Sequence, residues 1–95
     1  MVQVLNVKLK RDDSNVPWGF DVKGGKDLNF PLAIQSVTPN SLADLASIRA
    51  NSFIIKVGNV STQHLTNDQA KELIFNQGNI LEMTIEWFSY LRLFL

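Results

Sequence analysis

The sequence predicts an α+β fold, a small antiparallel barrel or sandwich of five to six strands in which two helices cover the open edges of the sheet. Three observations lead to this class. Short apolar runs of strand length recur along the chain, most of them bounded by glycine, proline or asparagine. Only two segments have helical spacing behind a helix-start residue. With 95 residues, 45% of them hydrophobic, the chain is long enough for one domain with a core and too short for two.

Three strands are predicted in the first half of the chain. Apolar residues nearly alternate with polar ones from Val2 to Leu9, as in a strand that buries one face. The second strand, Trp18–Lys23, stops at Gly24-Gly25, because paired glycines favour a turn. The third strand, Leu32–Val37, is closed by the turn around Pro39.

A short helix and two more strand segments are predicted next. Ser41 is a common helix-start residue, and the apolar residues Leu42, Leu45 and Ala46 after it share one face at spacings of three and four. The run Phe53–Val57 is apolar and β-branched, which is typical of a buried strand, and a turn then leads to a strand stub at Val60.

The clearest predicted helix begins at Thr66. Thr66 and Gln69 have the spacing of a capping box, in which the threonine hydroxyl accepts from the third backbone N–H and the glutamine reaches back. Gly78, after Gln77, supplies the left-handed residue with which helices commonly end. A last strand is predicted over Ile80–Trp87.

Composition excludes several classes of protein. Nine Lys and Arg residues balance nine Asp and Glu residues, whereas nucleic-acid binders normally carry a clustered positive excess. The chain has no cysteine, hence no disulfide, thiol nucleophile or cysteine-bound zinc. Its densest apolar run, 87–95, is interrupted by Arg92 and is far shorter than the roughly 20 residues of a membrane span. We therefore expect no nucleic-acid partner, no transmembrane segment, no metal or cofactor, and a cytoplasmic location.

The most informative stretch is Pro17-Trp18-Gly19-Phe20 at the entry to the second strand. A glycine between two bulky residues lets successive backbone N–H groups converge on one point, because Gly19 tolerates backbone angles that other residues avoid. Such a nest suits an anion, and the flanking apolar side chains suit an apolar group. The C-terminal carboxylate of a peptide, next to an apolar last side chain, offers both.

This stretch resembles the carboxylate-binding loop of PDZ domains, which is usually written G-Φ-G-Φ with Φ apolar. The resemblance extends over residues 4–87 and includes the glycine pair after the second strand, the third strand and the helix that starts at Thr66. It is most specific to the PDZ modules at the N-terminus of the Enigma and actinin-associated LIM protein (PDZ-LIM) group, through residues 17–20, 24–32 and 37–39. It implies a PDZ-like fold, a partly open antiparallel β-barrel or sandwich capped by two helices.

The resemblance assigns the end of the ligand to five residues. The backbone N–H groups of Trp18, Gly19 and Phe20 would bind the peptide carboxylate. The pocket for the last side chain would be lined by Trp18, Phe20, Val22 and Ile74. The charged loop 10–15 also carries two basic residues, Lys10 and Arg11. Whether one of them helps to bind the carboxylate, and which one, is left open.

The rest of the ligand would meet a second group of residues. By the same resemblance, the backbone of Asp21, Val22 and Lys23 would pair with the peptide as an added strand beside the Thr66 helix. Asn67 stands where many PDZ domains have a histidine that hydrogen-bonds a Ser or Thr two residues before the ligand's end. Lys71, one turn further along, would meet an acidic ligand side chain.

The resemblance thus implies a non-enzymatic interaction module, residues 1–87, that captures partner C-termini as a cytoskeletal scaffold or adaptor. Its partners would include actin crosslinkers such as α-actinin, near actin structures in the cytoplasm. The apolar tail 88–95 opens an alternative, because Leu93-Phe94-Leu95 has the apolar-x-apolar pattern of one PDZ ligand class and would make a self-assembling adaptor by entering a neighbour's groove. A more distant reading is a small hydrolase that uses Ser61 and His64, although no oxyanion site is suggested around them.

Overall fold

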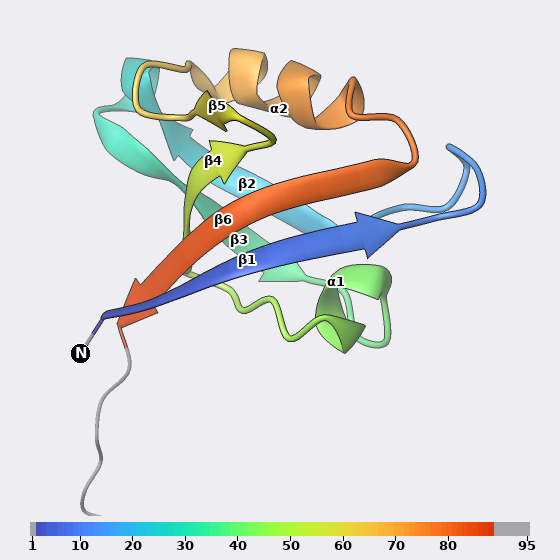
Figure 1. The fold of residues 1–95 in the computed structure, drawn as a ribbon. Coiled ribbons are helices and arrows are strands. Elements are labelled where there is room, and N and C mark those ends of the chain that lie inside the picture. Colours follow the sequence, from blue (N-terminus) through green and yellow to red (C-terminus); the bar gives the residue numbers. More distant parts are fainter. Residues whose placement is uncertain (1, 89–95) are drawn as a thin grey trace, which may run out of the picture.

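The structure is a computed structural model and describes residues 2–88. Its predicted α+β class, with six strands and two α-helices, is confirmed (Figure 1). A 3-10 turn, η1, replaces the loop expected after the second strand. In chain order the elements are β1 (Val2–Lys10), β2 (Phe20–Gly25), η1 (Lys26–Leu28), β3 (Phe30–Val37), α1 (Leu42–Leu45), β4 (Phe53–Val57), β5 (Val60–Ser61), α2 (Asn67–Phe75) and β6 (Ile80–Phe88).

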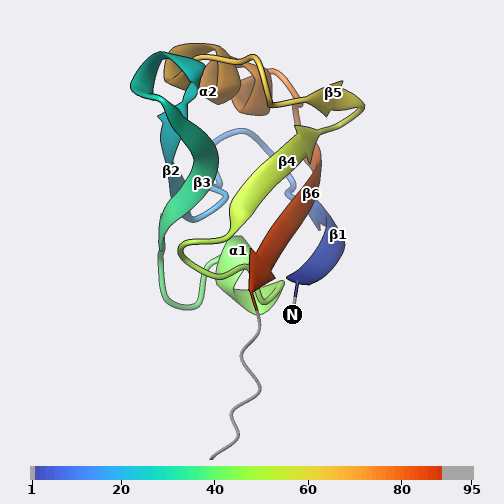
Figure 2. The ribbon, with the colours of Figure 1, turned by 90° about the vertical axis from the view of Figure 1, so that its left-hand side faces the viewer.

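All strands pair antiparallel in the order β1-β6-β4-β3-β2, and β5 pairs with β4. β1 and β6 pair without a register shift from Val2 opposite Phe88 to Lys10 opposite Ile80. By contrast, Ala33 opposite Phe53 is the single pair that joins β3 to β4. The sheet bends at that pair, so β2 and β3 stand apart from β4, β6 and β1 (Figure 2). This split produces the partly open barrel that the sequence predicts.

The two helices lie at opposite ends of the bent sheet (Figures 1 and 2). The predicted capping box of α2 is present: Thr66 Oγ1 accepts from the Gln69 N–H at 3.1 Å, and Gln69 Oε1 accepts from the Thr66 N–H at 2.9 Å. α2 buries Ala70 and Ile74, which lie four residues apart and therefore on one face. Gly78 follows the helix with φ 77°, in the left-handed region.

The core is built from side chains of every strand except the short β5. In β1 the buried side chains alternate with exposed ones, so that Val7 and Leu9 face inward while Lys8 and Lys10 face outward. The least exposed large side chains come from β3, β4 and β6: Ile34, Ile54, Leu81, Ile85 and Val57. The core therefore lies between the two parts of the bent sheet and under both helices.

Of the three apolar residues predicted to share one face of the short helix, Leu42 and Ala46 pack against the core, but Leu45 is 75% exposed. Ala43 is the fully buried residue of α1. The predicted Ser41 cap is present, with Ser41 Oγ accepting from the Asp44 N–H at 3.2 Å.

Replacing Thr66 with alanine removes one half of the capping box. We expect the free energy of unfolding to fall by about 1 kcal/mol, the usual loss when an N-cap hydroxyl is deleted. Urea unfolding of Thr66→Ala and Thr66→Ser measures it. The serine variant retains the hydroxyl and should keep most of the stability; an alanine variant as stable as the wild type would contradict the cap.

Candidate functional site

A groove of about 460 Å³ lies between β2 and α2. β2 is the last strand of the sheet, so one of its edges pairs with β3 while the other faces α2. An open strand edge offers backbone N–H and C=O groups to a further strand. The structure brings most of the predicted site residues together here, because the groove is lined by Pro17, Trp18, Gly19, Phe20, Asp21, Val22, Ser36, Thr38, Lys71 and Ile74.

The loop before β2 directs two backbone N–H groups toward this groove. The carbonyl of Trp18 accepts from the Ala43 N–H at 2.9 Å, and the carbonyl of Gly19 accepts from the Thr38 N–H at 2.8 Å. In a trans peptide the C=O and the following N–H point in opposite directions. The N–H groups of Gly19 and Phe20 therefore point away from α1 and β3, to the side where the groove lies.

Gly19 is required in this loop for two reasons. Its φ of 94° lies in the region that residues with a side chain rarely adopt. A Cβ on Gly19 would also come within 2.1 Å of the Ser41 Cβ, which is far inside any real contact distance. The loop can therefore approach the start of α1 only with glycine at this position.

An apolar wall lies beside the two N–H groups. Val22 of β2 and Ile74 of α2 are 7% and 8% exposed and belong to the core, while Phe20 packs against them and is half-buried. Trp18 is 8% exposed, so it is a core side chain as well as part of the groove lining. The Gly19 and Phe20 N–H groups thus lie beside an apolar surface at one end of the groove.

Asn67, at the start of α2, is not among the residues that line the groove and bonds instead to the end of β2 and to η1. Its Nδ2 donates to the Gly24 carbonyl at 2.8 Å, and its backbone N–H donates to Asp27 Oδ1 at 2.9 Å. A Cβ on Gly25 would lie 2.5 Å from the Asn67 backbone nitrogen, so this close approach also depends on glycine. Sequence reasoning missed the contact with Gly24, because nothing in the sequence indicates a hydrogen bond between positions that are 43 residues apart.

The charged residues of the predicted site lie on two elements: Asp21 and Lys23 on β2, and Lys71 on α2. Asp21 and Lys23 alternate with the inward-facing Val22, so their side chains lie on the face away from the core. Lys23 Nζ donates to Asn51 Oδ1 at 2.8 Å. The Lys23 ammonium is therefore engaged by Asn51, and the backbone of Lys23 is the part that remains for the predicted site. Lys71 is exposed on α2 and lines the groove.

The residues of the hydrolase alternative are not arranged as a nucleophile and its base. Ser61 Oγ accepts from the Gln63 N–H at 3.3 Å, a local turn contact, and His64 is exposed. Within residues 2–88 no hydrogen bond joins these two side chains. The same span contains no group of three or more acidic or histidine residues that could hold a metal ion.

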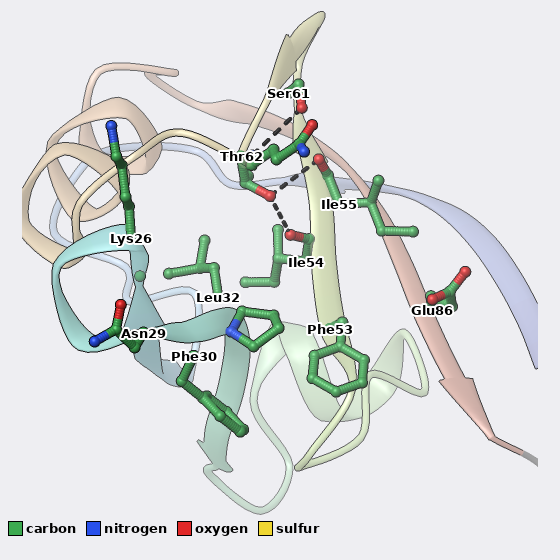
Figure 3. A pocket seen from close by; sticks show the side chains of 13 residues that line it. Lys26, Asn29, Phe30, Leu32, Phe53, Ile54, Ile55, Ser61, Thr62 and Glu86 are labelled. Carbon is green, nitrogen blue, oxygen red and sulfur yellow. Dashed lines mark hydrogen bonds between the residues drawn. The ribbon is translucent and has the colours of Figure 1, made fainter.

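A larger hollow of about 640 Å³ lies elsewhere, where β3 and β4 diverge (Figure 3). Phe30 and Phe53, with ring centroids 6.3 Å apart, form part of its apolar lining. Two hydroxyl side chains, Ser61 and Thr62, line it. Thr62 Oγ1 donates toward the carbonyls of Ile54 and Ile55, and Ser61 Oγ accepts from the Gln63 N–H (Figure 3). The smaller groove is the better candidate, since it alone joins an open strand edge to the two N–H groups of the loop.

The geometry agrees with the comparisons to known proteins. The family model described as the PDZ domain matches residues 6–86, and the chain belongs to this family of protein-interaction modules. The second PDZ domain of Dlg1 from the choanoflagellate Monosiga brevicollis has the same fold: the TM-score is 0.82 at 18% identity, over 90% of this chain and all of that chain.

Curated relatives identify the branch of the family. The chain is 32% identical over 84 residues to PDZ and LIM domain protein Zasp of Drosophila melanogaster, and 38% identical over 69 residues to human PDZ and LIM domain protein 1. These matches cover 88% and 73% of this chain but 4% and 21% of the relatives. Among residues 2–88 no helix is long and apolar enough to cross a membrane.

We expect Gly19→Ala to destabilise the domain much more than Gly78→Ala. Both glycines have positive φ, which costs a non-glycine residue about 1–3 kcal/mol, but only the alanine at position 19 meets another residue. Gly78 has open space where a Cβ would be. Equal losses of unfolding free energy in urea would show that the contact with Ser41 is unimportant.

Proposed function

We propose that the groove between β2 and α2 binds the C-terminal peptide of partner proteins as an added strand beside β2. The observation that carries the proposal is the pair of anchored carbonyls at Trp18 and Gly19, which turns the next two N–H groups toward the groove. A terminal carboxylate fits these donors, and an apolar last side chain fits the surface of Phe20, Val22 and Ile74. The backbone of Asp21, Val22 and Lys23 pairs with the rest of the peptide.

The expected affinity is modest. Each hydrogen bond to the charged carboxylate contributes about 1.5–3 kcal/mol, and burial of one Leu or Val side chain contributes about 1.5–3 kcal/mol more. Several kcal/mol of association and ordering cost oppose these terms, so only a small surplus remains as binding free energy. Such an affinity suits reversible assembly without catalysis.

The relatives suggest the biological setting. Their names combine PDZ and LIM domains, and the PDZ-LIM resemblance implies scaffolding at the actin cytoskeleton. We infer that the partners include actin crosslinkers of the α-actinin kind and that the protein works in the cytoplasm near actin. The self-assembly alternative depends on Leu93-Phe94-Leu95, which lie outside the described residues.

The carboxylate model is tested with a peptide and its C-terminally amidated twin. We expect the acid to bind at least tenfold more tightly by calorimetric titration, because the amide removes the charge that strengthens the hydrogen bonds. Phe20→Ala should also weaken binding of the peptide with the free carboxylate, since the substitution removes part of the apolar surface. Equal affinities of the two peptides for the wild type would remove the model, and a variant without residues 89–95 checks that the tail does not compete.

Asn67 is proposed to select a hydroxyl group in the ligand. Because its Nδ2 donates to Gly24, its Oδ1 is the atom left to accept from a Ser or Thr two residues before the ligand's end. We expect Asn67→Ala to lower the preference for threonine over valine at that ligand position about fivefold, the value of one net hydrogen bond.

Asn67→Asp is the matched control for this prediction. Aspartate keeps the acceptor but cannot donate to the Gly24 carbonyl, so it should retain the threonine preference while the domain loses stability. Titrations of both peptides against each variant give the preference directly. If Asn67→Ala prefers threonine over valine as strongly as the wild type does, a residue other than Asn67 is responsible for the selectivity.

A further inference from the structure

Arg11 connects the loop before β2 to the turn after α2. It follows β1, at the start of the loop that leads to β2. Its Nη1 donates to the Val16 carbonyl at 2.9 Å, and its Nη2 donates to the Gly78 carbonyl at 2.9 Å. Nε donates to Asn79 Oδ1 at 3.3 Å, and the Arg11 backbone N–H donates to the Asn79 carbonyl at 3.0 Å. All three guanidinium nitrogens therefore have protein acceptors.

The flat face of the same guanidinium lies over the indole of Trp18. The distance from Cζ to the ring centroid is 4.2 Å, well within the range of a cation–π contact. Trp18 belongs to the core, and its carbonyl is anchored to α1. Arg11 thus contacts the loop at two points, a carbonyl before the tryptophan and the ring of the tryptophan itself.

The other end of this bridge is the turn after α2, the helix that forms the far wall of the groove. Carbonyls at and beyond the end of a helix lack partners inside the helix and carry partial negative charge. The Gly78 carbonyl is placed to receive a cation, and the left-handed φ of Gly78 sets the direction of the turn. One side chain thereby fixes the separation between the loop 16–20 and the C-terminal end of α2.

We propose that Arg11 is a positioning residue for the carboxylate-binding loop, which rests on the function proposed above. It holds the Gly19 and Phe20 N–H groups in their convergent arrangement by clamping the loop to the α2–β6 turn. Its contribution comes from the fork geometry and the flat face rather than from charge alone. Lysine is therefore a poor substitute, because an ammonium group cannot make divergent hydrogen bonds and stack on a ring at once.

The test uses the full chain with Arg11→Lys, Arg11→Met and the neighbouring control Lys10→Met, which removes an exposed positive charge of β1 without touching the clamp. Amide hydrogen exchange of Ala43 and Thr38, whose N–H groups donate to the Trp18 and Gly19 carbonyls of the loop, is measured without ligand. We expect both Arg11 variants to exchange at these positions roughly tenfold faster or more, as when a hydrogen bond to a charged group is lost. Ile85 in the core should be unchanged in all variants, which excludes global unfolding.

Peptide titration provides the second readout. The preference for the acid peptide over its amidated twin should fall about tenfold in both Arg11 variants and stay unchanged in Lys10→Met. A global loss of stability alone would not move this ratio in a protein that is still folded. Emission of Trp18, recorded in a Trp87→Phe background, should shift in both Arg11 variants because the cation leaves its ring.

Three results would overturn the inference. Exchange at Ala43 and Thr38 unchanged in Arg11→Met would show that the loop needs no clamp. A wild-type acid preference in Arg11→Lys, combined with its loss in Arg11→Met, would show that charge acts on the carboxylate directly. An equal effect of Lys10→Met would indicate a general electrostatic field. If the wild type binds acid and amide equally, the proposed function fails, while the exchange rates still decide whether Arg11 holds the loop.

Discussion

The anchoring of two consecutive peptide groups, 18–19 and 19–20, is the constraint on which the groove depends. Their carbonyls point toward the N–H groups of Ala43 and Thr38. Because C=O and N–H are antiparallel in a trans peptide, their own N–H groups point the opposite way. α1, a helix of one turn, therefore has a larger role than its size suggests, because it supplies one of these anchors and the Ser41 side chain that excludes a Cβ from Gly19. The donors are ready before any ligand arrives, and preorganised donors lose little entropy on binding.

The groove and the larger hollow show that volume is a poor guide to function in this domain. The hollow beside Phe30 and Phe53 is bigger and more apolar, yet its threonine hydroxyl bonds to the strand beneath it. The β2–α2 groove is smaller but lies beside an open strand edge and the Gly19 and Phe20 N–H groups. Specific recognition of a carboxylate needs charge-assisted hydrogen bonds at a fixed place, and the donors proposed for this role lie at the smaller site.

The sequence predicted the elements because each is marked locally. Alternation marks β1, the Thr66–Gln69 pair marks α2, and Trp18-Gly19-Phe20 marks the loop. What it could not predict are contacts between distant segments: the Asn67 amide on the Gly24 carbonyl, and Arg11 on the turn after α2. The acceptors in these bonds are backbone carbonyls, which every residue has, so the residue type at the acceptor position does not indicate the bond. In α1 the apolar spacing is only partly followed, since Leu42 and Ala46 pack against the core while Leu45 is exposed, and a single turn is too short to define a continuous apolar face.

The unbroken pairing of β1 with β6 has a consequence for how the domain fits into a longer polypeptide. Val2 lies opposite Phe88, so the chain enters and leaves the fold at the same place, at the end of the sheet away from α2 (Figure 1). Neighbouring segments attached there would branch from one point and leave the groove uncovered. The same adjacency makes the domain a good subject for circular permutation: a short linker between the two paired ends would change the order of the strands along the chain but not their arrangement in the sheet.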